Sequence, residues 1–351
     1  MRRYAIWGTS TSPAHEDWVA SIGKQFEQDD FTKVDEVADA NFVLNMFDPD
    51  DPKAFRRGSR GTYSAAFYEL PETPDDVLKA SYPMLVRTLS NVVLLRIPGD
   101  GVWFTTMERG TYHVADDAEE IYARLEPLAT SRLVIDNDWH PDLEPELWDG
   151  DEITTDISAA GERLDELDLL PSPFPVEEYL SGRDLRHVMR LYSVGGLSYG
   201  NLSARKDETR FWMSASGVDK SKLETVGRDL LMVKDFDDER GVIVLSVPPG
   251  IEPRRVSVDA IEHWMIYQAH PDVGAILHIH AWMEEIAATD VNYPCGTQEL
   301  AVAVADLVAA EPDPSHAVIG LRNHGLTCTG DTLSEILDRV APKVLRQVPM
   351  T

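Results

Sequence analysis

The chain has 351 residues, of which 43% are hydrophobic, so it is long and apolar enough for two domains with packed cores. Its formal net charge is −29, with 61 acidic against 32 basic residues, which argues against nucleic acid and membranes as partners because both favour basic patches. Two cysteines are too few for a disulfide framework, and neither an apolar leader nor an apolar run of about 18 residues occurs, so we expect a cytoplasmic protein.

The first part of the chain alternates between predicted strands and predicted helices. A short strand at 3–8 precedes a helix in which Trp18, Ile22 and Phe26 recur at four-residue spacing. Further strands are predicted at 40–46, 61–68, 91–96, 101–105 and 132–136, and further helices at 75–89 and 118–128. Such alternation is typical of a small α/β domain with a largely parallel sheet, Rossmann-like or flavodoxin-like, which we place at residues 1–150 without assigning it a role.

Two features of this domain allow more than one interpretation. Gly8 and the hydroxyl residues after it precede a helix, where backbone N–H groups could bind a phosphate, but the stretch matches neither a dinucleotide-binding motif nor a P-loop. A plain turn with a capping serine is therefore the favoured interpretation. Arg56, Arg57 and Arg60 form a basic cluster that could bind an anion or a neighbouring subunit, or simply balance the local acid.

A change of composition separates the two halves of the chain. Thirteen acidic residues and one basic residue, Arg163, occur between positions 142 and 178, and this stretch contains Pro171, Pro173 and Pro175. Proline favours extended conformations for itself and for the residue before it. We therefore predict an acidic, proline-rich linker at 151–175, with room for a short helix at 162–170.

The last part of the chain, residues 176–351, is predicted to form the second domain. Helices are expected at 176–192, 261–268, 281–287, 298–310 and 332–344, and strands at 211–217, 230–235, 242–246 and 274–280. The strands at 230–235 and 242–246 are expected to pair as an antiparallel hairpin.

Three histidines of this second domain form a candidate metal site. In the buried strand at 274–280, His278 and His280 are two residues apart, so they point to the same face, about 7 Å apart along the backbone. His324 lies far along the chain beside Gly325, a residue that allows close approach of the backbone. Three neutral imidazoles with an open position are typical of a catalytic metal centre, since structural sites usually recruit cysteines. The alternative is that the histidines are hydrogen-bonded core residues.

Five motifs connect this domain with a known family. In chain order they are Gly200-Asn-Leu-Ser-Ala-Arg205, Ser214-Ala-Ser-Gly-Val-Asp-Lys220, Tyr267-Gln-Ala-His-Pro-Asp272, His278-Ile-His280 and Asn323-His-Gly325. Together they resemble the class II aldolase/adducin family, and within it the metal-dependent lyases of the L-fuculose-phosphate aldolase type. The resemblance implies a catalytic three-layer α/β/α domain at 176–351 with a mixed, mostly antiparallel sheet. It also implies a homo-oligomer, commonly a tetramer.

The resemblance also assigns candidate residues for substrate binding and catalysis. Positions that match the family's turns for an anionic substrate group, commonly phosphate, are Gly200, Asn201, Ser216, Gly217, Lys220 and Ser257. Glycine and asparagine also favour plain turns. The family's Ser-Ser-Glu is here Ser257-Val258-Asp259, which removes one hydroxyl and shortens the carboxylate side chain. Asp259 is the candidate base or, alternatively, a cap of the following helix; Tyr293 is a candidate proton donor, and His263 is expected to pack nearby or orient Asp259.

These residues predict the chemistry of an enzyme that acts on a small molecule. A divalent ion, zinc in the first place with iron or manganese as alternatives, would stabilise the enolate or enediolate of a hydroxy-carbonyl substrate, phosphorylated or not. We expect retro-aldol cleavage to an aldehyde. Epimerisation, dehydration, decarboxylation and an iron-dependent oxygenase reaction are the enzymatic alternatives, and an adducin-like interaction module without metal is the alternative of another class.

Overall fold

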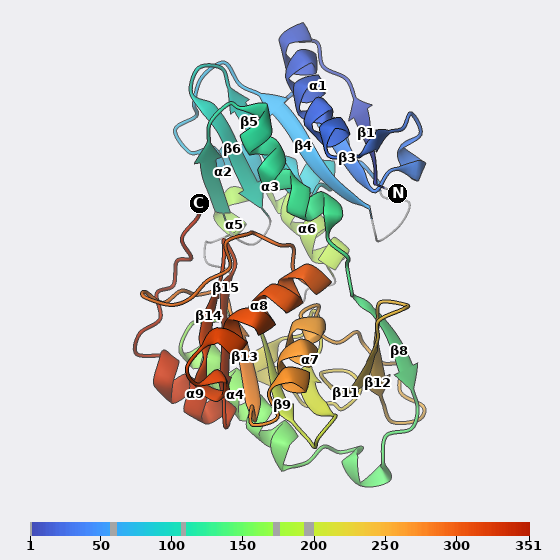
Figure 1. Cartoon of the computed structure of the whole chain (residues 1–351), viewed down its shortest axis with the longest axis vertical. Coiled ribbons are helices and arrows are strands. Elements are labelled where there is room, and N and C mark those ends of the chain that lie inside the picture. Colours follow the sequence, from blue (N-terminus) through green and yellow to red (C-terminus); the bar gives the residue numbers. More distant parts are fainter. Residues whose placement is uncertain (1, 57–61, 107–109, 171–175, 193–199) are drawn as a thin grey trace. The chain divides into compact units, whose positions relative to one another are not determined.

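The computed structural model describes residues 2–56, 62–106, 110–170, 176–192 and 200–351 (Figure 1). These residues divide into two compact units. Unit 1 comprises residues 1–130, 174–190 and 350–351, and unit 2 comprises residues 131–173 and 191–349. The boundaries differ from the expected ones, because 131–150 belongs to the second unit and most of the helix expected at 176–192 belongs to the first.

Unit 1 is built on a seven-stranded sheet with the strand order β2-β1-β3-β4-β5-β6-β7. Its strands are β1 Arg3–Gly8, β2 Thr32–Lys33, β3 Phe42–Met46, β4 Tyr63–Glu69, β5 Val92–Ile97, β6 Gly101–Thr106 and β7 Gly110–Val114. The first four pairs in this order are parallel and the last two are antiparallel. The helices are α1 Pro13–Gln28, α2 Val77–Thr88, α3 Ala118–Thr130, α5 Val176–Tyr179 and α6 Gly182–Tyr192. Unit 1 is thus an α/β unit with the largely parallel sheet that the alternating pattern predicts.

Helix α6 is tied to unit 1 by an ion pair. Asp184, in the first turn of α6, lies 2.9 Å from the guanidinium of Arg87 in α2. The Asp184 side chain also accepts a hydrogen bond from the Ser181 hydroxyl at 2.7 Å. These contacts explain why this helix, expected to open the second domain, groups with the first.

The turn after β1 is closed by a carboxylate of the chain itself. Asp48 accepts hydrogen bonds from the Ser10 hydroxyl at 2.7 Å and from the Thr11 amide at 3.0 Å. The Ser12 hydroxyl caps α1 by accepting a hydrogen bond from the His15 amide at 3.3 Å. The plain turn with a capping serine is therefore the correct interpretation of this stretch, and its donors bind an internal anion.

Unit 2 contains an eight-stranded sheet with the order β14-β15-β13-β9-β10-β11-β12-β8. Its strands are β8 Asp136–His140, β9 Asn201–Arg205, β10 Phe211–Ser214, β11 Leu230–Asp237, β12 Val242–Ser246, β13 Ala275–Ile279, β14 Val318–Leu321 and β15 Gly325–Gly330. Every pair is antiparallel except β12 with β8, so the sheet is mixed and mostly antiparallel. The expected hairpin of the strands near 230–235 and 242–246 is β11 with β12.

Four helices accompany this sheet: α4 Glu152–Glu166, α7 Ala260–Ala269, α8 Gln298–Ala310 and α9 Leu333–Val340. Helix α7 packs with α8 and α4 packs with α9, and all four helices contact strands of the sheet (Figure 1). A short 3-10 helix, η3 Lys220–Lys222, packs against α4. One hydrophobic core runs through the sheet and these helices.

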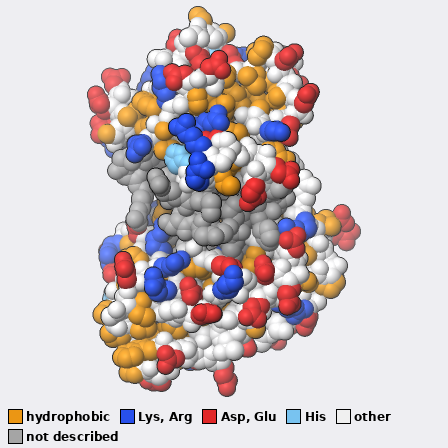
Figure 2. All heavy atoms as spheres, turned by 180° about the vertical axis from the view of Figure 1, so that it is seen from behind, with side chains coloured by type: hydrophobic (Ala, Val, Ile, Leu, Met, Phe, Trp, Pro, Cys, Tyr) orange, Lys and Arg blue, Asp and Glu red, His pale blue; other side chains and the backbone are white. Residues whose placement is uncertain are grey.

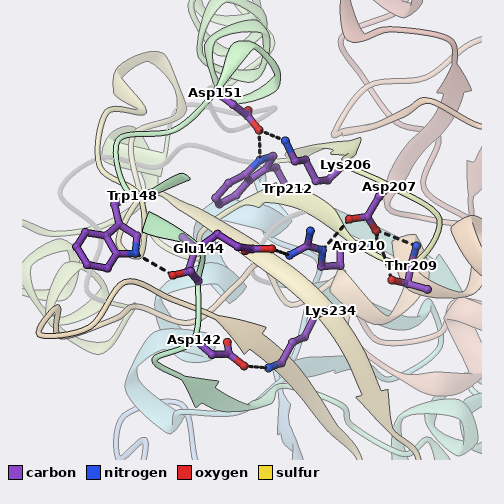
Figure 3. Close-up of polar contacts among 11 residues, drawn as sticks. Asp142, Glu144, Trp148, Asp151, Lys206, Asp207, Thr209, Arg210, Trp212 and Lys234 are labelled. Atoms are coloured by element: carbon purple, nitrogen blue, oxygen red, sulfur yellow. Dashed lines mark hydrogen bonds and ion pairs between the residues drawn. The ribbon is translucent and has the colours of Figure 1, made fainter. Parts of the chain in front are cut away.

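The acidic segment before and within α4 is fixed to unit 2. Its carboxylates form ion pairs with lysine and arginine side chains of the sheet region (Figure 3). The pairs are Asp142–Lys234 at 2.5 Å, Glu144–Arg210 at 2.7 Å and Asp151–Lys206 at 2.8 Å. In α4 itself, Ile157, Ala160 and Leu164 are buried at helical spacing. The predicted linker is therefore wrong for 151–166, where the acid content masked an apolar stripe; its proline-rich end, 171–175, lies outside the described residues.

The helix expected at 281–287 does not form. Trp282 and Leu345 exchange two backbone hydrogen bonds of 2.8 and 2.7 Å, and Ala288 forms a parallel bridge with Gly320. Glu285 has a φ of 59°, which lies outside the right-handed helical region. The apolar residues of this stretch therefore pack along other segments instead of forming one face of a helix.

Acidic side chains are spread over the face of the molecule shown in Figure 2 and do not form one continuous patch there. Of the predicted basic cluster, Arg56 is exposed, whereas Arg57 and Arg60 lie outside the described residues. None of the helices in the described ranges is both long and apolar enough to cross a membrane.

Candidate metal centre

Strand β13 and the turn before β15 bring three histidine rings together. His278 lies in β13, His280 follows that strand directly, and His324 immediately precedes β15. Their exposed fractions are 0%, 6% and 2%, respectively. The ring centroids are 5.2 Å apart for His278 and His280, 4.7 Å for His278 and His324, and 5.0 Å for His280 and His324. The three predicted ligands therefore surround one point.

The ring nitrogens have the spacing that a metal ion requires. One nitrogen from each of the three rings lies within 4.8 Å of the other two. The Nε2 atoms of His278 and His324 are 3.2 Å apart, close to the roughly 3.3 Å expected for two imidazoles on a tetrahedral zinc ion. The planes of the rings cross at 73°, 86° and 88°, so the nitrogens approach each other while the rings stay apart. This donor set fits a divalent ion such as zinc, iron or manganese.

Two glycines allow the neighbouring strands to approach β13 closely. A Cβ on Gly200, before β9, would overlap the carbonyl oxygen of His278, and Gly200 also has a φ of +76°. A Cβ on Gly325, at the start of β15, would overlap the carbonyl oxygen of Ile279 and lie 3.1 Å from the Cα of His280. Both glycines are thus required beside the histidine strand, and the expected close approach of Gly325 to another segment is found.

Asp259 lies at the N-cap position of α7, but its side chain does not cap the helix. Its Oδ2 accepts a hydrogen bond of 2.7 Å from Nδ2 of Asn201. Asn201 lies directly across from His278 in the register of β9 and β13, so these two side chains share one face of the sheet. The helix-cap alternative is therefore wrong. Asn201, a predicted substrate contact, donates one of its N–H groups to Asp259.

Lys220 is buried in η3 with 3% of its surface exposed. Burial lowers the pKa of Lys220 to about 8, although the charges of Asp259 and Asp219 act in the opposite direction. A Cβ on Gly161 of α4 would overlap the backbone oxygen of Lys220, so this glycine lets α4 support η3 closely. Helix α4, in the stretch predicted as a linker, therefore helps to position Lys220.

Glu262 and Thr327 are site residues that the sequence analysis missed. Glu262 lies in the first turn of α7 and is 1% exposed. Its Oε1 accepts a hydrogen bond of 2.5 Å from the Thr327 hydroxyl, and that hydroxyl is 3.4 Å from Nδ1 of His278. Burial first, and then the charge of Asp259, raise the pKa of Glu262 to about 8. The available signal was a single glutamate in a helix that is otherwise largely apolar.

His263 has a packed position rather than an orienting one. Its Nδ1 is 2.7 Å from the Ser203 hydroxyl, which also lies 2.9 Å from the Tyr267 hydroxyl. Burial, and after it the charge of His278, keep the pKa of His263 well below its usual value. The only described hydrogen bond between His263 and Asp259 joins backbone atoms, so the packed role expected for His263 is what the structure shows.

The other predicted residues lie in turns and loops of unit 2. Ser216 and Gly217 follow β10, and Ser257 is buried with its amide 3.2 Å from the Ser214 carbonyl oxygen. Tyr293 is half-buried against the core, and no described hydrogen bond joins it to the three histidines. Cys295, in the loop before α8, places its Sγ 3.4 Å from both ring nitrogens of His324.

Comparison with known proteins extends these observations. Among curated proteins, methylthioribulose-1-phosphate dehydratase of Klebsiella pneumoniae (strain 342) is 25% identical over 167 residues, which cover 39% of this chain and 76% of that protein. The protein of the same name from Citrobacter koseri is 32% identical over 95 residues, or 27% of this chain and 41% of that one.

Solved structures give similar matches at lower identity. L-fuculose-1-phosphate aldolase from Thermus thermophilus aligns with a TM-score of 0.35 and 17% identity, over 54% of this chain and 90% of that one. An aldolase II superfamily protein from Pseudomonas syringae aligns with a TM-score of 0.36 and 20% identity, over 57% and 76%. The family model described as Class II Aldolase and Adducin N-terminal domain matches residues 185–289. Residues 185–289 of this chain therefore match the class II aldolase and adducin family.

Proposed function

We propose that unit 2 is a metal-dependent lyase that cleaves a carbon–carbon bond of a small hydroxy-carbonyl compound by a retro-aldol reaction. The observation that carries this proposal is the meeting of three buried histidine rings around one point. The nearby Asp259 and Lys220, whose charges interact, add a candidate base and a candidate acid.

The proposed metal ligands are His278, His280 and His324, with zinc as the first candidate and iron or manganese as alternatives. When bound, the ion supplies a Lewis acid that stabilises negative charge developing on the carbonyl oxygen of the substrate. The burial of the three rings limits their exposure to water, which strengthens electrostatic interactions at this point.

Asp259 is the proposed base. Its carboxylate takes the proton of the substrate hydroxyl on the carbon that becomes the aldehyde, and the electrons of the breaking carbon–carbon bond pass to the carbonyl group. Asp259, or Lys220 as the ammonium form, then protonates the carbon of the second product. Asn201 holds the Asp259 carboxylate in place through its 2.7 Å hydrogen bond. Tyr293 is the alternative to Asp259 for the hydroxyl proton, and its phenol would return that proton to the alkoxide in the reverse direction.

The remaining predicted residues are proposed to bind the anionic end of the substrate. They are Gly200, Ser216, Gly217, Lys220 and Ser257. Val258 stands where the family has a second hydroxyl, so we propose a carboxylate or a phosphate as the anion rather than a phosphate alone. By resemblance we also propose a three-layer α/β/α arrangement for unit 2 and assembly of the chain into a homo-oligomer.

Dehydration is the second candidate reaction, favoured by the name of the curated relatives, methylthioribulose-1-phosphate dehydratase. In this reaction Asp259 would take the proton from the carbon next to the carbonyl group. The hydroxyl on the following carbon would leave as water with a proton from Lys220, so that one substrate gives one unsaturated product and water.

The test combines metal analysis with a reaction screen of protein purified without chelator. Hydroxy-ketones, hydroxy-acids and their phosphates are incubated with the enzyme, and the products are identified by proton NMR. Retro-aldol cleavage gives two carbonyl products from one substrate, whereas dehydration gives one product that has lost water. Less than about a tenth of an equivalent of transition metal, with no product, would contradict both reactions and favour an adducin-like interaction module.

A further inference from the structure

Glu262 is a buried carboxylate whose described contacts do not offset the cost of burial. Only Oε1 has a hydrogen-bond partner among the described residues, the Thr327 hydroxyl, whereas Oε2 is buried without one. The position of Glu262 in the first turn of α7 gives some stabilisation from the helix dipole. Burial raises the pKa of Glu262 to about 8, so its anionic form is disfavoured here, and an apolar side chain would be more stable at this position unless a cation lies nearby.

The hydroxyl of Thr327 connects this carboxylate with a proposed metal ligand. Thr327 and His278 are direct partners in the register of β15 and β13, so their side chains share one face of the sheet. A hydroxyl has one proton to donate. If Thr327 gives that proton to Glu262, its lone pair faces Nδ1 of His278 at 3.4 Å and can accept only from a protonated Nδ1. The lone pair of that imidazole then belongs to Nε2.

Nε2 is the nitrogen of His278 that points to the other histidines. It lies 3.2 Å from Nε2 of His324, whereas Nδ1 faces Thr327. The hydrogen-bond chain from Glu262 through Thr327 therefore selects the tautomer of His278 that can bind an ion at the shared point. Partners of this kind on the second ring nitrogen orient metal-binding histidines and raise their basicity.

The N-terminal end of α7 contacts both strands that flank His278. Asp259 bonds to Asn201, the direct partner of His278 on β9, and Glu262 bonds to Thr327, its direct partner on β15. The N-terminal end of α7 thus places one carboxylate beside a residue of each of the two strands that flank His278.

We propose that Glu262 and Thr327 are positioning residues for the metal: they hold His278 with Nδ1 protonated and Nε2 directed at the ion. This inference rests on the metal site of the proposed function and is independent of which reaction the enzyme catalyses. If the pair served packing alone, its removal would change stability and leave metal affinity as it was.

The test measures zinc affinity by competition with a chromophoric chelator. Thr327→Val removes the hydroxyl at constant shape, and Glu262→Leu removes the acceptor; each is expected to weaken zinc binding about 10- to 100-fold. Thr327→Ser and Glu262→Gln keep a hydroxyl and an acceptor oxygen, so they are expected to restore most of the affinity. Zinc binding by Thr327→Val and Glu262→Leu that is as tight as that of the wild type would overturn the proposal, as would Glu262→Gln losing as much as Glu262→Leu.

Thr329→Val is the matched control. Thr329 lies two residues further along β15 and is fully buried, but its hydroxyl bonds to Pro314 and Ala317 rather than to a carboxylate. This variant is expected to lose stability and keep its zinc affinity. A long-range proton–nitrogen NMR correlation is a second readout: the zinc-free wild type should show protonated Nδ1 in His278, and Thr327→Val should show a mixture of tautomers. The same mixture in the wild type would overturn the proposal.

The outcome also separates this inference from the proposed function. If the wild type binds zinc and all variants bind it equally, the inference fails and the metal site stands. If the wild type binds no zinc, both fail.

Discussion

The close approach of Gly200 and Gly325 to β13 predicts that an alanine at either position will disturb the histidine site. At Gly200 two costs add together. An L residue with a φ of +76° costs about 1–2 kcal/mol, and the overlap of the new Cβ with the backbone of His278 adds about 1–3 kcal/mol, the usual cost of overpacking. We therefore expect Gly200→Ala to lose about 2–5 kcal/mol and to bind zinc more weakly, because β13 must move.

Two other glycines separate these costs. Gly250 has a φ of +81° and nothing within 4 Å of the position that a Cβ would take, so Gly250→Ala pays the conformational cost alone, about 1–2 kcal/mol. Gly325→Ala meets the backbone of Ile279 and His280 and carries the overlap cost alone, about 1–3 kcal/mol. The assay measures, for each variant, the shift in the urea midpoint of unfolding of the zinc-bound protein. Zinc affinity is measured separately. Equal stability losses in Gly200→Ala and Gly250→Ala, with unchanged zinc affinity, would refute the reasoning.

Three further predictions concern the proposed base, the buried lysine and the acidic segment. Asp259→Asn should keep its zinc content and lower kcat by about 10²- to 10⁴-fold, the usual contribution of a general base; unchanged turnover would remove Asp259 from the mechanism. Because the pKa of Lys220 is lowered to about 8, its ammonium form is lost as the pH rises through that value, so kcat should fall there. Lys220→Met should lose this alkaline limb of the pH profile, and a limb that persists in the variant belongs to another group. Asp151→Ala removes the N-cap of α4 and the partner of Lys206 and Trp212, so urea unfolding should show a loss of about 1–3 kcal/mol. Asp156→Ala, at an exposed position of the same helix, should change the free energy of unfolding little. Equal losses of stability in Asp151→Ala and Asp156→Ala would favour the predicted linker.

The sequence predicts the elements that carry the site because their patterns are local. Two histidines in an apolar strand must share a face, and this alternation depends only on the geometry of that strand. The apolar runs near 274–280 and 242–246 likewise predict β13 and β12, two interior strands of the sheet of unit 2. The position of His324 beside Gly325 was predictable because glycine marks a close backbone approach, and the structure shows that approach to β13.

Residues whose role depends on strand register were not predictable in this way. Thr327 and Asn201 flank His278 only because β15 and β9 pair with β13 in one particular register. No local pattern indicates which residue of a distant strand will stand opposite a histidine. Glu262 was missed for the same reason, since its partner lies on β15 and not on its own helix.

Composition misled the prediction of the linker. The acidic residues of 142–166 suggested a solvated connector, but several of them pair with lysine and arginine of the sheet region, and α4 buries the apolar side of the same stretch. The helix predicted at 281–287 failed because the spacing of its apolar residues also suits an extended segment with contacts on both sides.

The most direct test of the central claim is zinc stoichiometry with X-ray absorption of the bound metal, for the wild type and for His324→Ala. We predict about one zinc ion for each chain, with imidazole nitrogens at about 2.0–2.1 Å, and loss of that ion from the variant. A wild-type protein that holds no metal, or a His324→Ala variant that keeps the same ion with the same ligands, would contradict this prediction.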